Sequence, residues 1–482
     1  MAIAAVDFTG SLNTSADELG GSIPVSSNVL IDASGVITRR PGVSAWDAFP
    51  QSMIDGVPVI GMTVYRGNLV WVTEDRRIRS VNPQGMSLEL SDATAATKLD
   101  GGLKPSFVSG RNMLVIAGGA QMQEWRGVGL SYRMPTLTPG QPPPPASHVS
   151  GIAQRLVVSA PSDSGQIWWS APLEAYEDWD FTFGAAGFIQ AAAKPDPIVA
   201  MFDNTNEVLC FGADTIQVFD PSATTIDSAG EQVVFTPTRT MNLGLIGRDA
   251  IVQVDDMFMM VDSNRRIVLT DARSYEDKGN EIVKTIREMA KANDAWGFRM
   301  RFGKHDCVVF MFPSSGKGYI YEIKAGRWST WTAFDKTGPT NVKVTAACYW
   351  PDLGKVMVGL ADGSICYLAD SSGGDLGDDI KAEIVSGFTD RGSSQQKWCK
   401  SLMLTFRREP GTVQDGFVRI YSRDNLGAFH FRNQINLGEK LQNTVIFRSL
   451  GTYRQRQWKI EYTGKNPFSL VSAQEDFEIL GV

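Results

Sequence analysis

Cysteine is scarce in this chain of 482 residues, and the few copies are dispersed. Cys210, Cys307, Cys348, Cys366 and Cys399 are odd in number and form no C-x-x-C pair. This spacing argues against a disulfide framework and against a zinc ribbon, and it is typical of a protein that folds in a reducing cytoplasm. We therefore expect no structural metal and no cofactor.

The chain also lacks long apolar runs and an excess of basic residues. No run approaches the 18 apolar residues of a membrane span, and Met1–Thr14 has neither the basic start nor the apolar core of a signal peptide. The formal net charge is −7. Because binding to phosphates needs a basic surface, this charge argues against a general nucleic-acid binder, whereas an acidic wall would let DNA slide past it.

Signatures of catalysis are absent as well: the chain has no G-x-S-x-G, P-loop, G-x-G-x-x-G or H-E-x-x-H motif. The stretch nearest to the aspartate-containing turn of sialidase-like propellers, Gly326–Thr332, lacks the aspartate. His305 and Cys307 lie on one face of an expected strand and could begin a metal site, but no second ligand pair accompanies them. We predict packed strand residues there and a protein that is not an enzyme, although a pair of catalytic carboxylates stays open.

A repeated hairpin is what the sequence does contain. Each unit is an apolar run, a short turn rich in Gly, Asp, Asn or Ser, and a second apolar run, which is the signal of a β-hairpin. Seven units begin near residues 67, 111, 154, 206, 256, 305 and 354. Their spacing is typical of propeller blades, in which radial stacking buries both faces of each small sheet. The sequence thus predicts an all-β protein with a β-propeller of about seven blades.

Two further segments depart from this repeat. Apolar residues at helical spacing between Asn280 and Asn293 predict one short amphipathic helix with Asn280 as its N-cap. After a flexible acidic loop at Asp370–Asp379, a different strand-rich region predicts an additional C-terminal β-sheet or sandwich domain. We therefore divide the chain into an N-terminal closing or docking arm (residues 1–50), the propeller (51–375) and the C-terminal β-rich domain (376–482).

Three stretches of the chain carry a recognisable pattern: Asn28–Trp46, NVLIDASGVITRRPGVSAW; Asp294–Phe334, which contains GKHDCVVFMFPSSGKGYIYEI; and Leu450–Gly464, LGTYRQRQWKIEYTG. They resemble a known family, the tail-nozzle or packaged-DNA stabilisation proteins of short-tailed bacteriophages. These stretches are patterns of packing residues rather than catalytic signatures.

The resemblance implies a virion structural protein of the tail, made in the host cytoplasm. It implies a homo-oligomeric ring, a hexamer, that docks on the portal adaptor protein, meets a tail needle or a fibre or tailspike, and passes DNA through its channel without reading its sequence. From the residues themselves, Arg39 and Arg40 are candidates for clamping a carboxylate across a subunit interface. Two alternatives stay open: a glycan-degrading propeller enzyme, either a depolymerase or sialidase-like, and a propeller that serves as a protein-binding scaffold.

Overall fold

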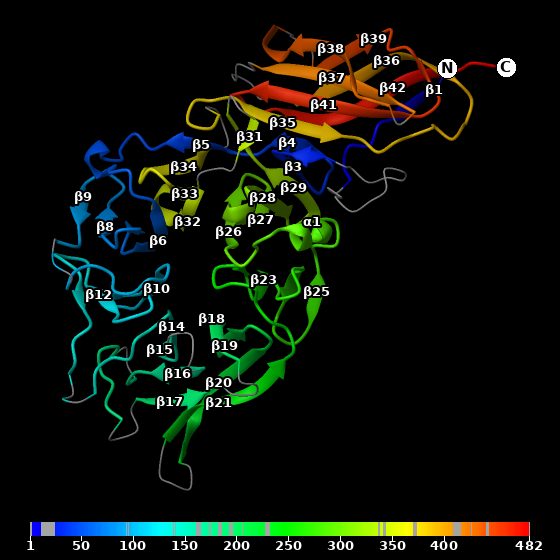
Figure 1. The fold of residues 1–482 in the computed structure, drawn as a ribbon. Helices are drawn as coiled ribbons and strands as arrows, with labels where there is room; N and C mark the ends of the chain where they lie inside the picture. Colours follow the sequence, from blue (N-terminus) through cyan, green and yellow to red (C-terminus); the bar gives the residue numbers. More distant parts are fainter. Residues whose placement is uncertain are drawn as a thin grey trace.

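The fold is all-β with one short helix, as the sequence predicts. The computed structural model describes residues 2–481, except 11–24, 93, 95, 138, 140, 161–164, 173–174, 182–185, 192–195, 205, 227–231, 336–337, 341–343, 370–373, 408–415, 426 and 440–442. A ring of small sheets forms one half of the molecule, and a stack of longer strands forms the other, with both chain ends at the far end of that stack (Figure 1).

Six separate four-stranded sheets form blades of the propeller, counted over the described residues. Three of them are β6–β9 (Val59–Tyr65, Asn68–Thr73, Ile78–Val81, Ser87–Glu89), β10–β13 (Ser106–Ser109, Leu114–Ala117, Gln123–Trp125, Tyr132–Arg133) and β14–β17 (His148–Ile152, Arg155–Ser159, Gln166–Trp169, Gly187–Gln190). The others are β18–β21 (Ile198–Asn204, Glu207–Gly212, Ile216–Ile226, Gln232–Met241), β22–β25 (Ile251–Val254, Met257–Val261, Ile267–Thr270, Tyr275–Asp277) and β32–β33–β34–β5 (Val344–Trp350, Lys355–Leu360, Ile365–Ala369, Gly42–Ala45).

The prediction of about seven blades is therefore corrected to six. The hairpin unit that contains His305 does form four strands, β26–β29 (Trp296–Phe302, His305–Phe312, Lys317–Glu322, Arg327–Trp331), between two of the blades. Its outer strand β29 is not an edge, however, because it pairs with β2 (Ser26–Ser27) and the sheet continues to nine strands. Local hairpin patterns could not reveal this continuation, since β2 lies about 300 residues away in the sequence.

Each predicted hairpin supplies the two middle strands of its unit. Middle strands are covered on both faces by neighbouring sheets, so they read as unbroken apolar runs. The innermost strands approach one another closely around the axis: a Cβ added to Gly61 of β6 would lie 2.2 Å from the Pro105 side chain, next to β10. The apolar clusters of the core accordingly join residues of adjacent units, such as Leu69 and Trp350.

Strand β5 completes its blade from the opposite end of the chain. It pairs antiparallel with β34, with Ser44 opposite Tyr367. The N-terminal strand β5 and the C-terminal strand β34 of the propeller are thus hydrogen-bonded to each other, and this pairing closes the ring of blades.

The C-terminal region is a sandwich of two sheets, which confirms the predicted additional domain. One sheet is β3–β4–β42–β36–β39 (Val29–Ile31, Ile37–Arg39, Ser469–Ile479, Lys397–Phe406, Thr444–Arg448), with β1 (Ala2–Ala5) and β40 (Thr452–Tyr453) attached. The other is the far part of the nine-stranded sheet, β2–β35–β41–β37–β38 (β35 Ile380–Val385, Arg456–Gly464, Phe417–Asp424, His430–Asn436). Buried side chains from both sheets, among them Leu402 and Ile420, share one apolar core. A small hairpin, β30–β31 (Ala333–Asp335, Gly338–Thr340), forms a separate two-stranded sheet that contacts β35.

The predicted boundaries 1–50, 51–375 and 376–482 stay predictions, but the strand pairing shows how the N-terminal arm is shared. Strands β3 and β4 belong to the sandwich, β2 joins the sandwich to β29, and β5 belongs to a blade.

The helix α1, Val283–Glu288, is shorter than the predicted segment between Asn280 and Asn293. Its N-cap is Ile282 rather than Asn280, and the chain is already extended at Met289. Ile282, Ile286 and Met289 are all buried in one apolar cluster with neighbouring blades, so the apolar face of this segment packs on the protein's own core. Short 3-10 turns occur at Gln51–Met53, Pro313–Ser315, Pro351–Leu353 and Leu437–Glu439.

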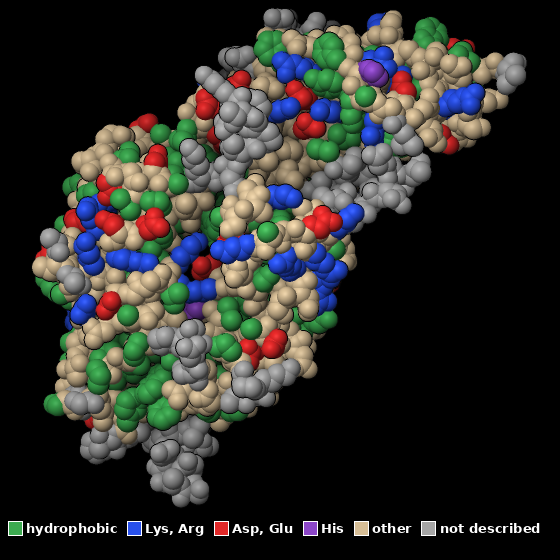
Figure 2. Space-filling model, in the orientation of Figure 1, with side chains coloured by type: hydrophobic (Ala, Val, Ile, Leu, Met, Phe, Trp, Pro, Cys, Tyr) green, Lys and Arg blue, Asp and Glu red, His purple; other side chains and the backbone are tan. Residues whose placement is uncertain are grey.

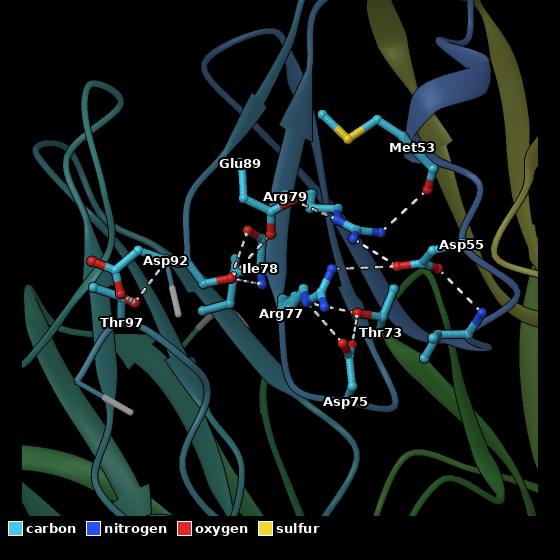
Figure 3. Close-up of polar contacts among 12 residues, drawn as sticks. Met53, Asp55, Thr73, Asp75, Arg77, Ile78, Arg79, Glu89, Asp92 and Thr97 are labelled. Carbon is cyan, nitrogen blue, oxygen red and sulfur yellow. Dashed lines mark hydrogen bonds and ion pairs between the residues drawn. The ribbon is translucent and has the colours of Figure 1, made fainter. Parts of the chain in front are cut away.

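Ion pairs brace the outer side of the first blade (Figure 3). Arg79 of β8 is buried; its guanidinium lies 2.8 Å from Glu89 on β9 and 2.7 Å from Asp55, and it also donates to the Met53 carbonyl. Arg77 contacts Asp75 and Asp55 but is 43% exposed. Arg79 therefore holds the segment before β6 against the blade, whereas Arg77 adds a surface contact.

Candidate functional sites at the domain junction and in the propeller channel

Arg40 lies at the junction between the propeller and the sandwich and is fully buried. Its guanidinium is 2.5 Å from Asp375, donates to Oδ1 of Asn28 at 2.8 Å and to the Thr332 carbonyl at 2.8 Å. It also stacks on the Trp331 ring, 4.6 Å from the ring centre. Planar bidentate pairing and stacking are what an arginine offers and a lysine does not. One side chain thus connects the N-terminal arm, the strand β29 and the segment before β35.

The charge of Arg40 changes the pKa of the Asp375 carboxyl group. Burial raises the pKa of its carboxyl group, but the charge of Arg40 and the hydrogen bonds from Arg40 and the Val43 amide outweigh burial, so the pKa lies below its usual value. Asp375 is therefore a carboxylate at neutral pH.

Arg39, the neighbouring residue, points elsewhere. Its Nη1 donates to the Gly464 carbonyl of β41 at 3.0 Å, and burial lowers its pKa to about 10. Its Nε is buried without a hydrogen-bond acceptor among the described residues. Both arginines of the predicted interface pair thus have their contacts inside this chain, and the partner carboxylate of Arg40 is its own Asp375. Their role in a subunit interface stays a prediction.

His305 and Cys307 lie on one face of β27, as expected, and share a single partner. Glu322 of β28 accepts from Cys307 Sγ at 2.9 Å and lies 3.0 Å from Nδ1 of His305. The other ring nitrogen of His305 contacts the Thr38 hydroxyl of β4 in the sandwich at 3.1 Å. Burial, followed by the charge of Glu322, raises the pKa of the Cys307 thiol well above its usual value. The cluster links propeller to sandwich, and no set of three potential metal ligands occurs among the described residues.

The innermost strands of the propeller surround a cavity of about 490 Å³. Its lining comes from β6, β10, β14, β18, β22, β26 and β32, so the cavity is the axial channel of the ring. Figure 2 shows the hollow in the middle of the propeller face, where basic, acidic and histidine side chains meet.

Arg248, just before β22, reaches across this channel. Its Nε donates to Nε2 of His148 at 3.0 Å, Nη2 donates to the Ser147 carbonyl at 2.6 Å, and Nη1 donates to the carbonyl of Lys104. His148 accepts this bond, so the ring is neutral; burial and the charge of Arg248 lower its pKa well below the usual value. One guanidinium thus ties the blade β22–β25 to two blades on the other side of the axis.

The sequence singled out Arg39, Arg40, His305 and Cys307, but it did not predict the residues that these side chains contact. Asp375 lies in the predicted acidic loop Asp370–Asp379, of which residues 370–373 lie outside the described residues. Arg248 and Lys104 carry no local signal, because a single basic residue before a strand is common in any loop.

A protein-family model described as "Phage_stabilise: Bacteriophage P22 Gp10, beta-propeller" matches residues 60–372, more than half of the chain. The chain belongs to this phage family. This confirms the resemblance to tail-nozzle and DNA-stabilisation proteins, and the protein is a structural component of a phage tail and hence of the virion.

Several solved structures show a distant similarity to the chain. The computationally designed Ika8 protein is 12% identical, with 68% of this chain and 99% of that chain covered and a TM-score of 0.38. The Pan2 WD40 domain of Neurospora crassa is 9% identical (68% and 94% covered, TM-score 0.39), and BamB from Moraxella catarrhalis is 11% identical (77% and 98% covered, TM-score 0.38). No curated protein matches the chain. Among the described residues, no helix is long and apolar enough to cross a membrane.

Proposed function

We propose that this protein forms a homo-oligomeric ring, the nozzle at the distal end of the tail channel, which retains packaged DNA and guides it during ejection. The observation that carries the proposal is the family match over residues 60–372, which makes the chain a phage tail protein of the Gp10 propeller type. In this role the ring docks on the portal adaptor, and a tail needle and a fibre or tailspike attach to it.

The way the two halves of the chain are joined supports a mechanical role. Strand β2 makes the unit β26–β29 and half of the sandwich one continuous sheet, and Arg40 and His305 add polar contacts across the same junction. A continuous hydrogen-bonded sheet resists bending between domains more than a flexible linker does. A ring built from such subunits would keep its channel dimensions under the pressure of packaged DNA.

The charge supports passage rather than binding of DNA. The net charge of −7 gives each subunit a repulsive field for a phosphate backbone, so a ring would confine DNA without gripping it.

DNA retention gives a direct test. Phage particles would be assembled with and without this protein, and DNase-accessible DNA would be measured after packaging. The proposal expects particles that lack the protein to release their DNA and added purified protein to prevent the release. Equal retention with and without the protein would contradict it.

The rival enzymatic function has its own readout. A propeller depolymerase would shorten bacterial surface polysaccharide, and a single carboxylate substitution would abolish that activity. Under the nozzle proposal the purified protein leaves such polysaccharide unchanged.

A further inference from the structure

The seven-stranded sheet of the sandwich has open edges at β39 and at β1. The strands β1, β42, β36 and β39 lie side by side in this order. In the part of the chain that the structure describes, β39 pairs only with β36, and β1 pairs only with β42. Both strands lie in the sandwich, and β1 is next to the N-terminus (Figure 1). An open edge presents N–H and carbonyl groups to which a further strand can pair.

The backbone of β39 shows which of its groups face this open edge. The N–H of Phe406 in β36 donates to the carbonyl of Asn443, one residue before β39. Because hydrogen-bonded residues alternate along an antiparallel strand, the odd-numbered residues of β39 face β36. The N–H and carbonyl groups of the even-numbered residues therefore face away from the sheet: Thr444, Ile446 and Arg448.

The same argument applies to β1. The N–H of Val6 donates to the carbonyl of Ala473, so the even-numbered residues of β1 face β42 and the odd-numbered Ile3 and Ala5 face away from it. The carbonyl of Ala5 accepts a hydrogen bond from Arg391 at 2.6 Å. The N–H and carbonyl of Ile3 and the N–H of Ala5 have no hydrogen-bond partner among the described residues.

Ile3 and Ile446 are exposed apolar side chains at the two open edges, with exposed fractions of 62% and 46%. Ile446 lies opposite Met403 of β36. Ile3 lies opposite Asp476 of β42, and Asp476 lies opposite Ser401 of β36. Because Ser401 and Met403 are two residues apart on one strand, both isoleucines point to the same face of the sheet, away from the apolar core.

The directions of the strands allow one copy of the chain to continue the sheet of another. Each neighbouring pair in the order β1–β42–β36–β39 is antiparallel, so β39 runs opposite to β1. A second copy in the same orientation, placed beside β39, therefore brings its own β1 antiparallel to that strand. Contacts between two different surfaces of equally oriented copies close into a ring when the rotation between the copies allows it.

One register satisfies both the hydrogen bonds and the side chains. With Ile3 of one copy opposite Ile446 of the next, the outward N–H and carbonyl of Ile3 meet those of Ile446, and the N–H of Ala5 meets the carbonyl of Thr444. The two exposed isoleucines then lie side by side on the same face, where each covers the other. A shift by two residues keeps the backbone match but places Ile3 opposite the charged Arg448.

We propose that the seven-stranded sheet continues from one copy of the chain to the next, with β1 of one copy paired antiparallel to β39 of its neighbour. This inference rests on the homo-oligomeric ring proposed above and supplies that ring with a contact between subunits. Backbone hydrogen bonds set the register of the contact, and the isoleucine pair excludes water from it.

Cross-linking of two cysteine variants tests the pairing. Within one chain, Ile3 and Ile446 are three strand spacings apart, about 14 Å, so a disulfide between these positions must join two copies. Across the proposed contact their Cα atoms would lie about 5.5 Å apart, within reach of a disulfide. A mixture of Ile3→Cys and Ile446→Cys chains is expected to give a cross-linked dimer on mild oxidation, seen on a non-reducing gel, and neither variant alone should do so.

Val471→Cys provides the matched control, since Val471 is a 41% exposed apolar residue of β42, within the same sheet. Mixed with Ile3→Cys, it should give no dimer. The wild type serves as the blank, because four of its five cysteines are buried and Cys348 is partly buried. Absence of the dimer from the Ile3→Cys and Ile446→Cys mixture, or a dimer of Ile446→Cys alone, would overturn the pairing.

Ile446→Pro tests the same contact without cysteine. The N–H of Ile446 faces away from β36, and proline is tolerated on an edge strand at such a position, so the variant should fold, as far-UV circular dichroism will verify. Sedimentation velocity is expected to show association weakened at least tenfold, whereas Ile446→Ala, which keeps the N–H, should lose less.

The outcomes separate this inference from the nozzle itself. If Ile446→Pro assembles as the wild type does and still retains DNA, the pairing of β1 with β39 is wrong and the nozzle stands. If the variant assembles normally but no longer binds the portal adaptor, the edge of β39 belongs to a strand of the adaptor, and the pairing between copies is again overturned. A wild-type chain that never assembles, even on the adaptor ring, would contradict both proposals.

Discussion

At the scale of single residues, Arg40 is a fully buried charged side chain that needs hydrogen-bond acceptors around its guanidinium. Its guanidinium is fully buried, yet Asp375, Asn28 and the Thr332 carbonyl supply an acceptor on each side. An ion pair of this kind adds little net stability compared with apolar residues of the same shape, but removal of one partner leaves the other charge buried and alone. The pair therefore specifies how the arm, the propeller and the sandwich fit together.

We predict that Arg40→Ala lowers the free energy of unfolding by about 3–5 kcal/mol, because it strands the Asp375 carboxylate. Urea denaturation followed by tryptophan fluorescence measures the loss. Arg77→Ala is the control: Arg77 also contacts two carboxylates but is 43% exposed, so the expected loss is below about 1 kcal/mol. Equal effects of the two substitutions would contradict the role given to Arg40.

The pH dependence of stability follows from Asp375. Its pKa is lower in the folded protein than in the unfolded chain, where an aspartate titrates at about 3.9. The unfolded state therefore takes up this proton first as the pH falls, and the stabilisation is fully present above about pH 4 and disappears as the pH drops through the folded pKa.

We expect the stability difference between the wild type and Asp375→Asn to be constant between about pH 7 and 5 and to shrink below about pH 4. Denaturant midpoints measured at several pH values test this, and the comparison of two proteins cancels the contribution of the other carboxylates. A difference that grows on acidification would show that Asp375 is not ionised in the folded state.

At the scale of strands and sheets, the apolar hairpins were predictable and their partners were not. Middle strands such as β7, which carries Leu69, and β11, which carries Leu114, are buried on both faces and leave a clear apolar pattern. Outer strands such as β13 (Tyr132–Arg133) are short and exposed, so they leave none.

Pairing between distant segments is the other part that local patterns miss. The sequence predicted that residues 1–50 close or dock, but not that β2 pairs with β29 and β35 while β5 pairs with β34. The same limit applies to the sites: Arg40 could be singled out, whereas its partner Asp375 lies 335 residues further on. The predicted number of blades was wrong for the same reason, because the pairing of β29 with the distant β2 could not be seen in the local pattern.

A proline in β5 tests the closure of the ring. The N–H and carbonyl of Val43 are bonded to Asp375 and Leu376, so by the alternation of an antiparallel strand the N–H of Ser44 faces β34. Ser44→Pro removes that donor, and we expect the free energy of unfolding to fall by about 1–3 kcal/mol. Ser44→Ala keeps the donor and should change the free energy of unfolding by less than about 0.5 kcal/mol.

Thermal and urea unfolding of both Ser44 variants provide the comparison. If Ser44→Pro unfolds at the same midpoint as Ser44→Ala, β5 does not hold the blade β32–β34 in place.

At the scale of the whole molecule, the propeller and the sandwich are joined through a shared sheet and through polar contacts. A continuous nine-stranded sheet runs through both, and the first and last strands of the propeller region are hydrogen-bonded to each other. A subunit with such a fixed shape suits a ring whose channel must neither widen under load nor bind what passes through it.

The assembled mass of the protein tests this account most directly. Native mass spectrometry of the purified chain, alone and mixed with the portal adaptor ring of its phage, would count the subunits. We predict a closed ring, six chains by resemblance to the family, that forms or is captured on the adaptor. A chain that stays monomeric at all concentrations and in the presence of the adaptor ring would contradict the nozzle.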